Sequence, residues 1–281
     1  MTVFLNGQFV DQERAVISVF DRSFLYGDGV FEALRISNSR PFRWQPHMAR
    51  LQVGLDYLKI RSPYSSDQLR DFAARLIAEN QMPESLLRIT ISRGVGKRGY
   101  SPVGADSPSV VMSLHPSLDV DSANPPRWKL ITSTVRLPAH EPLASFKTCT
   151  KIPQILARAE ADAADADDAL LLNTEGFVVE GSSSNLFWLE DGVVCTPPLP
   201  AGILPGVTRL VVFELCSKLK LPVREANITP SKLSGSDALF LSLTSSGIAE
   251  AASLDGKPFA PSETVHTLSQ AYWNLVRTET T

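Results

Sequence analysis

The sequence has little of what a disulfide framework, a metal centre or a membrane span requires. It contains three cysteines, Cys149, Cys195 and Cys216, which are scattered along the chain and form no Cys-x-x-Cys pair. The four histidines are equally dispersed and show no metal-ligand spacing. No apolar run approaches the roughly 18 residues that a membrane-spanning helix needs. We therefore expect no structural disulfide, no metal site and no membrane partner.

A strong excess of charge of either sign is also absent. The 281 residues include 27 Lys and Arg against 30 Asp and Glu, and 43% of them are hydrophobic. This balance gives no reason to expect nucleic acid as a partner and suits a globular protein of one large or two modest domains. The segment Met1–Gly7 lacks the basic and apolar regions of a signal peptide. We therefore expect a cytoplasmic protein.

The N-terminal half has the hydrophobic periodicity of a small mixed domain. Two stretches carry apolar residues at helical spacing, and four alternate or run apolar as strands do. The predicted helices are Pro46–Ile60 and Asp67–Glu79, and the predicted strands are Val3–Leu5, Val30–Ile36, Leu86–Ser92 and Ser109–Leu114.

A stretch rich in Pro, Asp and Ser predicts an interdomain connector at 117–127, between a smaller N-terminal α/β domain (1–116) and a larger C-terminal domain (128–281). Strands and helices interleave in the second half without strict βαβ regularity, which favours the α+β class. The predicted strands there are Trp128–Val135, Ala169–Leu172, Phe177–Val179, Leu186–Leu189, Val193–Cys195 and Leu239–Leu243, and the helices are Ile152–Ala164, Val207–Leu219 and one near Ser262–Val276.

The most informative motif lies in this second half. Glu180-Gly-Ser-Ser-Ser-Asn-Leu-Phe187 is followed by Val194-Cys-Thr196 and by Leu204-Pro-Gly-Val-Thr-Arg209. It joins a carboxylate at the end of a strand to a glycine turn that opens an amphipathic helix. Free N–H groups at a helix start bind anions, and a nearby carboxylate suits a cationic heterocycle. The combination fits a phosphorylated, protonated pyridine.

With this spacing the chain resembles the fold-type IV enzymes, which use pyridoxal 5'-phosphate. The family comprises branched-chain and D-amino-acid aminotransferases and 4-amino-4-deoxychorismate lyases. The resemblance runs from about residue 2 to about residue 260. It implies a D-amino-acid aminotransferase-like fold of two α+β domains with the cofactor at their interface. It also implies a homodimer in which a partner loop completes the active site, acting on a small-molecule amine or amino acid.

By this resemblance, the lysine that would bind the cofactor lies in Pro142-Leu-Ala-Ser-Phe-Lys147-Thr. Apolar neighbours such as Leu143 and Phe146 suit an amine that must lose its proton. From the residues alone Lys151 competes for this role, and a lysine beside a loop is more often a solvated surface charge. The resemblance favours Lys147, because Leu-Ala-x-x-Lys directly precedes a helix in the lyases.

The resemblance assigns further cofactor contacts. Glu180 would pair with the pyridine nitrogen and keep it protonated. The start of the Val207–Leu219 helix, a second hydroxyl at Thr244 and the bidentate charge of Arg50 would bind the phosphate, whereas Asn185 would brace the turn. The assigned cofactor-binding residues are Arg50, Lys147, Glu180, Leu204, Gly206, Val207, Thr208 and Thr244.

The segment Arg93–Gly99 contains Gly-x-Gly-x-x-Gly after a predicted strand. A dinucleotide site also requires a helix to begin inside the motif, and the following Tyr-Ser-Pro-Val-Gly cannot form one. We reject that interpretation. The segment instead resembles the substrate-facing loop of the lyases, with Arg98 kept and Tyr100 where D-amino-acid aminotransferases have His. The full set of expected substrate residues is Tyr26, Phe31, Arg98, Tyr100, Ser245 and Ser246, with Glu32 a further candidate.

The motifs favour a 4-amino-4-deoxychorismate lyase, which would release pyruvate and leave 4-aminobenzoate for folate synthesis. Arg98-Gly-Tyr-Ser, Pro142-Leu-Ala-x-x-Lys147 and Thr244-Ser-Ser-Gly-Ile speak for it, whereas Thr150 stands where Asn is usual. The alternative is a class-IV aminotransferase for D-amino or branched-chain amino acids with a 2-oxo acid acceptor, in which Ser245 and Ser246 could serve a substrate carboxylate. A non-catalytic cofactor-binding protein is disfavoured because Lys147 and Glu180 are both present.

Overall fold

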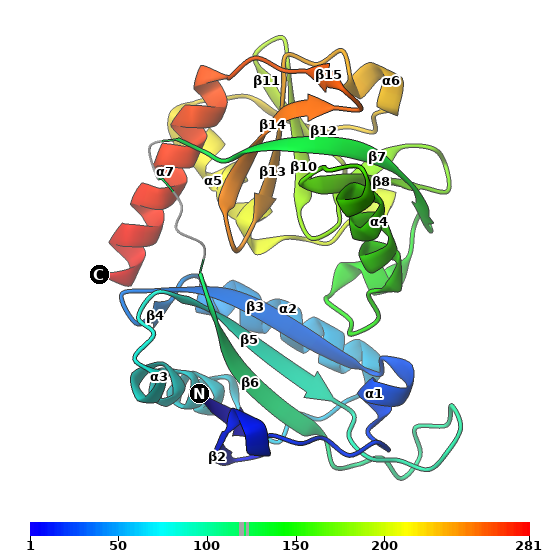
Figure 1. Cartoon of the computed structure of the whole chain (residues 1–281), viewed down its shortest axis with the longest axis vertical. Helices are drawn as coiled ribbons and strands as arrows, with labels where there is room; N and C mark the ends of the chain where they lie inside the picture. The colour runs from blue at the N-terminus through cyan, green and yellow to red at the C-terminus, as the bar shows by residue number, and fades with distance from the viewer. Residues whose placement is uncertain (118–120, 122–123) are drawn as a thin grey trace. The chain divides into compact units, whose positions relative to one another are not determined.

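The computed structural model describes residues 1–117, 121 and 124–281, and it divides into two compact units (Figure 1). The first contains Met1–Ser117, Phe146–Thr150 and Val276–Thr281, and the second contains Leu118–Ser145 and Lys151–Leu275. The expected connector at 117–127 includes residues 118–120, 122 and 123, which lie outside the described residues.

The first unit is built on a six-stranded sheet in the order β2-β1-β6-β5-β3-β4. Strands β3 and β5 pair antiparallel from Gly29–Ser92 to Ile36–Ser85. Side chains alternate between the two faces of a strand, so β3 sends Val30, Glu32 and Leu34 to one face and Phe31 to the other. The bounds are β1 Thr2–Leu5, β2 Gln8–Asp11, β3 Gly29–Ser37, β4 Arg40–Pro41, β5 Ser85–Ser92 and β6 Ser109–Pro116.

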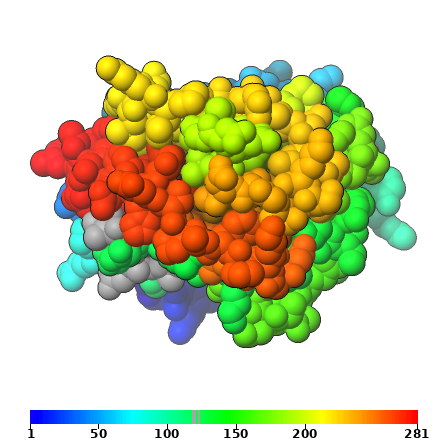
Figure 2. Space-filling view, turned by 90° about the horizontal axis from the view of Figure 1, so that it is seen from above, coloured from blue at the N-terminus to red at the C-terminus, as the bar shows by residue number. Residues whose placement is uncertain are grey.

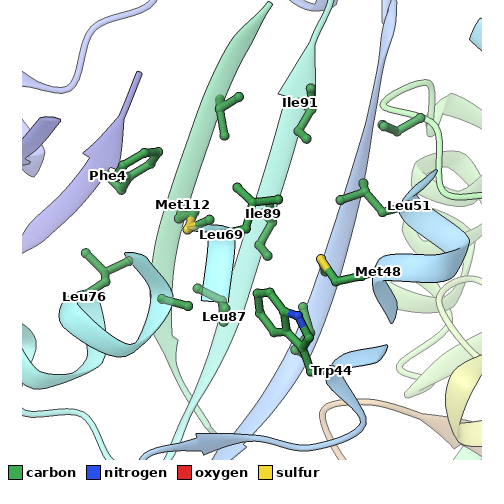
Figure 3. Close-up of a cluster of buried hydrophobic side chains, with 14 of the residues drawn as sticks. Phe4, Trp44, Met48, Leu51, Leu69, Leu76, Leu87, Ile89, Ile91 and Met112 are labelled. Atoms are coloured by element: carbon green, nitrogen blue, oxygen red, sulfur yellow. The ribbon is translucent and has the colours of Figure 1, made fainter. Parts of the chain in front are cut away.

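Two long helices cover one face of this sheet. Helix α2 (Trp44–Leu58) packs on β3, and α3 (Ser66–Asn80) packs on β1 and β6. Their apolar stripes meet the inward side chains of the strands in one buried cluster, in which Met48 and Leu51 lie near Ile89 (Figure 3). The other face of the sheet therefore carries the polar side chains of β5.

The short helix α1 (Arg22–Tyr26) precedes β3 and is capped by the side chain of Asp21, which accepts a hydrogen bond from the Ser23 N–H. The 3₁₀ turns η1 (Gln12–Arg14), η2 (Pro142–Ser145) and η3 (Leu199–Ala201) connect other elements.

The second unit is built on a nine-stranded sheet in the order β12-β11-β10-β13-β14-β7-β8-β9 with β15 on β14. Strand β9 also pairs with β10, so the strands from β10 to β9 form a closed ring. Strand β7 pairs parallel with both β8 and β14. The bounds are β7 Arg127–Leu137, β8 Asp168–Asn173, β9 Val178–Gly181, β10 Asn185–Glu190, β11 Val193–Thr196, β12 Val223–Glu225, β13 Ala238–Leu243, β14 Gly247–Leu254 and β15 Lys257–Pro258.

Helices pack around this ring. Helix α4 (Ile152–Ala163) lies on β7 and β8, and α5 (Val207–Leu219) lies on β13. Helix α6 (Pro230–Leu233) precedes β13, and α7 (Glu263–Thr280) ends the chain. Figure 2 shows α7 and the β14–β15 region, in red and orange, on the surface. In the described part of the chain no helix is both long and apolar enough to cross a membrane.

The predicted α+β class is confirmed, and each predicted helix and strand overlaps an observed one. The sequence patterns did not predict α1, β2 or the long central strand β14.

Candidate active site

Lys147 lies in an extended segment beside β3 in the first unit. The Phe31 N–H donates to the Lys147 carbonyl (2.9 Å), and the Cys149 N–H donates to the Gly29 carbonyl (2.9 Å). Val30 and Thr148 form an antiparallel bridge between these bonds. The segment therefore continues the sheet at its β3 side, which fixes the backbone of Lys147. Lys151 instead precedes the first turn of α4 in the second unit.

Two cations lie against the buried ring of Phe31. The Lys147 Nζ is 5.2 Å from the ring centroid, and the Arg88 Cζ is 3.8 Å from it. Burial lowers the pKa of Arg88, although its guanidinium stays charged at neutral pH. The expected apolar neighbour Leu143 is exposed, so the aromatic surface beside the Lys147 amine comes from Phe31. The arrangement places an amine and a fixed positive charge on one face of the sheet.

Phe146 anchors this segment on the opposite face. Its ring is buried against helix α2, where Gly54 makes room for it. A Cβ atom at Gly54 would lie 2.8 Å from Phe146 Cδ2 and 2.9 Å from Val30 Cγ1. The missing side chain of Gly54 therefore sets the depth at which Phe146, and with it the backbone of Lys147, is seated.

Replacing Gly54 with alanine should lower the unfolding free energy by about 1–2 kcal/mol, because overpacking outweighs the gain of about 1 kcal/mol in helix propensity. Denaturant unfolding measures this change. In a Phe146→Leu background, Gly54→Ala should lower the unfolding free energy less than it does alone, since leucine frees space in the slot. Stability at or above that of the parent protein would contradict the account.

A buried cluster between β3 and α2 contains Glu32, His47 and Arg50. Arg50 donates through Nε to Glu32 Oε1 (2.7 Å) and through Nη2 to Oε2 (2.8 Å). His47 Nδ1 lies 2.7 Å from Glu32 Oε2. Arg50, expected at the phosphate, is thus held through two of its nitrogens by Glu32. Its contact with a phosphate stays a prediction.

The pKa values in this cluster follow from burial and charge. Burial acts to raise the pKa of Glu32, but hydrogen bonds and charges from Arg50 and His47 outweigh it and lower the value to about 2. Burial lowers the pKa of His47. The hydrogen bond and the charge of Glu32 act to raise it, whereas the charges of Arg50 and Lys147 act to lower it. His47 is therefore neutral at pH 7 and donates a hydrogen bond, so the positive partner of Glu32 is Arg50.

Acid should weaken the fold through this cluster. Because the folded-state pKa of Glu32 lies below the unfolded value of 4.5, its ionisation stabilises the fold above pH 4.5, and the contribution is lost as pH falls toward 2. The full contribution is about 3 kcal/mol. Urea unfolding at pH 7, 5 and 3 measures this contribution. The difference in unfolding free energy between the parent protein and Glu32→Gln should decrease as the pH falls. A constant difference would contradict the assignment.

In the second unit, Glu180 and Asn185 fix the backbone of Leu204 from both sides. The Leu204 N–H donates to Glu180 Oε2 (3.0 Å), and Asn185 Nδ2 donates to the Leu204 carbonyl (2.8 Å). Glu180 and Asn185 are themselves register partners on β9 and β10. The expected brace at Asn185 is present in this geometry, and it ties the carboxylate of Glu180 to the turn that leads into α5.

Gly206 ends this turn and caps α5. A Cβ atom there would lie 1.9 Å from Asn185 Oδ1, so no larger residue fits. No side chain caps the helix, and Val207 and Thr208 at its start are buried. The first N–H groups of a helix have no intrahelical partner and carry partial positive charge. A side-chain-free turn followed by these N–H groups and the Thr208 hydroxyl fits a phosphate group.

Asp168 on β8 holds the turn between β9 and β10 through hydrogen bonds. Its buried carboxylate accepts hydrogen bonds from the hydroxyls of Ser182 and Ser184 and from the Ser182 N–H (3.2 Å). Asp168 therefore positions the strand ends that carry Glu180 and Asn185.

Thr244, Ser245 and Ser246 form the tip of the hairpin between β13 and β14, closed by the Leu243–Gly247 pair. Ser246 is buried, and the other two are half-buried. The structure thus brings these three predicted residues together at one turn of the second unit.

Residues 93–108 contain no helix, so the helix start that a dinucleotide motif requires is missing from this segment. Within this loop the Gly99 N–H donates to the hydroxyl of Tyr26 (3.1 Å), and the rings of Tyr26 and Tyr100 meet edge to face at 5.6 Å. Arg98 and Tyr100 are exposed. The loop therefore gathers three of the predicted substrate residues around α1.

Arg88 and Asp168 are among the residues of these clusters that were not predicted from the sequence. Arg88 had a usable signal, because Leu87-Arg-Ile-Thr-Ile91 alternates and so sends Arg88 to the face opposite the core. Asp168 had none, since its role depends on a serine turn that follows in the next hairpin.

The family described as amino-transferase class IV matches residues 29–254, most of the chain and all but one of the elements that carry these clusters. The chain belongs to the class-IV aminotransferase family. Class-IV aminotransferases use pyridoxal phosphate, so the expected enzyme class and cofactor are confirmed. The uncapped start of α5 and the braced carboxylate of Glu180 fit its phosphate and its protonated ring.

Curated relatives cover nearly the whole of this class-IV aminotransferase. The "Putative branched-chain-amino-acid aminotransferase" of Methanocaldococcus jannaschii is 33% identical over 92% of this chain and 89% of its own length. The D-alanine aminotransferase of Staphylococcus aureus (strain MSSA476) is 28% identical over 91% of this chain and 90% of its own length.

Solved structures agree with the expected fold-type IV architecture, which is confirmed. A branched-chain aminotransferase from Thermoproteus uzoniensis superposes with a TM-score of 0.91 at 28% identity, covering 99% of this chain and 96% of that chain. A "Putative 4-amino-4-deoxychorismate lyase" from Legionella pneumophila gives a TM-score of 0.86 at 28% identity, covering 94% and 97%.

Proposed function

We propose that this class-IV enzyme is an aminotransferase that moves the amino group of an amino acid to a 2-oxo acid. The observation that carries the proposal is the pair of cations on Phe31, in which the Lys147 amine and the Arg88 guanidinium lie 5.2 and 3.8 Å from one ring centroid. An amine can move a proton at the substrate α-carbon, and a half-buried arginine can bind a carboxylate. Both partners of a transamination carry a carboxylate.

Pyridoxal phosphate, when bound, supplies an electron-withdrawing ring that stabilises negative charge on the substrate carbon. Lys147 holds the cofactor, and its amine, once free, moves a proton at the substrate α-carbon. Glu180 keeps a proton on the ring nitrogen, with its Oε2 oriented by the Leu204 N–H. The N–H groups of Val207 and Thr208 hold the phosphate. Arg88 holds a carboxylate of the amino acid or of the 2-oxo acid.

A lyase acting on 4-amino-4-deoxychorismate is the second candidate. The loop sequence Arg98-Gly-Tyr-Ser favours it, and the Legionella neighbour supports it over most of the chain. Its substrate also carries a carboxylate that Arg88 could bind. The two activities differ in what remains on the protein after one turnover.

The test uses the enzyme loaded with pyridoxal phosphate and no 2-oxo acid. D-alanine, L-leucine, L-glutamate and enzymatically generated aminodeoxychorismate are added separately, while the cofactor spectrum and products are followed. An aminotransferase converts stoichiometrically to the pyridoxamine form with an amino acid, and a 2-oxo acid reverses the change. Catalytic release of 4-aminobenzoate and pyruvate with an unchanged spectrum would instead establish the lyase.

We also propose that the enzyme is a cytoplasmic homodimer. Several large apolar side chains near α1, Val19, Phe20 and Phe24, are exposed on the first unit and offer a surface for a second copy. Sedimentation equilibrium at micromolar concentration tests this, and a monomer throughout would contradict it.

A further inference from the structure

Arg22 lies almost fully buried at the start of α1 and gathers three consecutive carbonyl groups. Its Nη1 donates to the carbonyls of Gly99 (3.0 Å) and Ser101 (3.2 Å), and its Nη2 donates to that of Tyr100 (3.1 Å). Its remaining nitrogen, Nε, donates to Asp28 Oδ2 (2.8 Å). The side chain is thus committed to a single short stretch of backbone and to the carboxylate that orients it.

The loop at residues 93–108 makes further contacts with α1. The Arg22 N–H donates to the Gly94 carbonyl (2.9 Å), and the Gly99 N–H donates to the Tyr26 hydroxyl. The Arg22 guanidinium also lies 5.1 Å from the centroid of the Tyr26 ring, which packs against Tyr100. Residues 97–104 of this loop contain no helix and are exposed. Its conformation at 99–101 therefore depends on α1, and on Arg22 most of all.

We propose that Arg22 is a positioning residue that supports substrate binding by fixing the 98–101 loop. Because its planar fork carries five N–H donors, arginine can bind three carbonyls and Asp28 together, which the three donors of a lysine ammonium cannot do from one point. The inference rests on the proposed function and on the prediction from the sequence that Arg98 and Tyr100 contact the substrate. Arg22 acts on the substrate only through their backbone.

Arg93 is a matched control within the same cluster. It pairs with the same Asp28 (Nε to Oδ2, 2.7 Å) but donates to the carbonyls of Leu58 (2.8 Å) and Lys59 (3.5 Å) at the end of α2. Replacing either arginine with lysine perturbs Asp28, whereas only Arg22→Lys releases the loop.

The experiment measures kcat and KM in the holoenzyme for Arg22→Lys, Arg93→Lys and Arg98→Gln. The donor is whichever of D-alanine, L-leucine and L-glutamate reacts fastest. Arg22→Lys should raise KM about tenfold, change kcat by less than about twofold and leave the cofactor absorbance unchanged. Amide hydrogen exchange across residues 94–104 should accelerate. Arg93→Lys should leave KM within about twofold.

A double variant separates positioning from general destabilisation. In an Arg98→Gln background, Arg22→Lys should raise KM by much less than it does alone, since both changes act through one loop. If Arg98→Gln raises KM and Arg22→Lys does not, the inference is wrong while the proposed function stands. If Arg98→Gln leaves KM unchanged, the proposed substrate role of the loop fails, and the inference fails with it.

Should Arg22→Lys not fold, Tyr26→Phe replaces it, because it removes the acceptor of the Gly99 N–H while keeping the ring beside Arg22. Since Tyr26 is itself a predicted substrate residue, the measurement in this variant is amide exchange at 99–101, which should become faster. Unchanged exchange would overturn the proposal.

Discussion

Replacing Lys147 with alanine should abolish turnover, with a fall in kcat of at least about 10³-fold, because the enzyme loses both its attachment to the cofactor and its proton carrier. The absorbance band of the lysine-bound cofactor should disappear. The fold should persist, since the bonds from Phe31 and Cys149 that hold this segment to β3 run through the backbone. Single-turnover kinetics, the visible spectrum and far-UV circular dichroism measure these three effects.

Lys151→Ala is the matched control. It lies four residues away at the start of α4 and should keep both the band and most of the activity. The opposite result, with the band kept in Lys147→Ala and lost in Lys151→Ala, would transfer the role to Lys151. Loss of the band in both variants would point to a general failure to bind the cofactor.

The local elements of this fold are readable from the sequence because their signals are local. The strand Leu86–Ser92 shows period-two alternation, and the helix Val207–Leu219 was predicted with its observed bounds from a glycine turn and an apolar stripe. Strand β14 escaped prediction. It lies between β13 and β7, is buried at most positions and is rich in alanine, so it shows no alternation and has a single β-branched residue, Ile248.

The predicted site residues also differ in how far away in the sequence their structural partners lie. Glu180, Gly206 and Thr208 belong to one continuous motif, and the brace through Leu204 joins residues at most 24 positions apart. Lys147 pairs instead with strand β3, more than a hundred residues earlier. Hydrophobic periodicity gives no information on contacts between residues so far apart in the sequence. A single domain boundary also cannot describe Phe146–Thr150, which belong to the first unit although they follow part of the second unit in the chain. The aromatic partner of Lys147 therefore had to come from the structure.

Glu180→Gln should lower kcat by about 10²–10³-fold while leaving the cofactor bound. Glutamine keeps an oxygen that can accept the Leu204 N–H, so the turn before α5 and its phosphate contacts should survive. What is lost is the negative charge that holds a proton on the ring nitrogen. Without that proton the ring withdraws electrons less strongly, and negative charge on the substrate carbon is less stabilised. Rapid-mixing measurement of the half-reaction with an amino acid isolates this step.

Asn185→Ala separates charge from geometry. It keeps the Glu180 carboxylate but removes the amide that holds the Leu204 carbonyl and lies against Gly206. We expect weaker cofactor binding with a near-normal kcat at saturating cofactor, because the phosphate cradle loosens while the ring charge remains. If Glu180→Gln also weakened cofactor binding and spared kcat, Glu180 would serve the turn and not the ring.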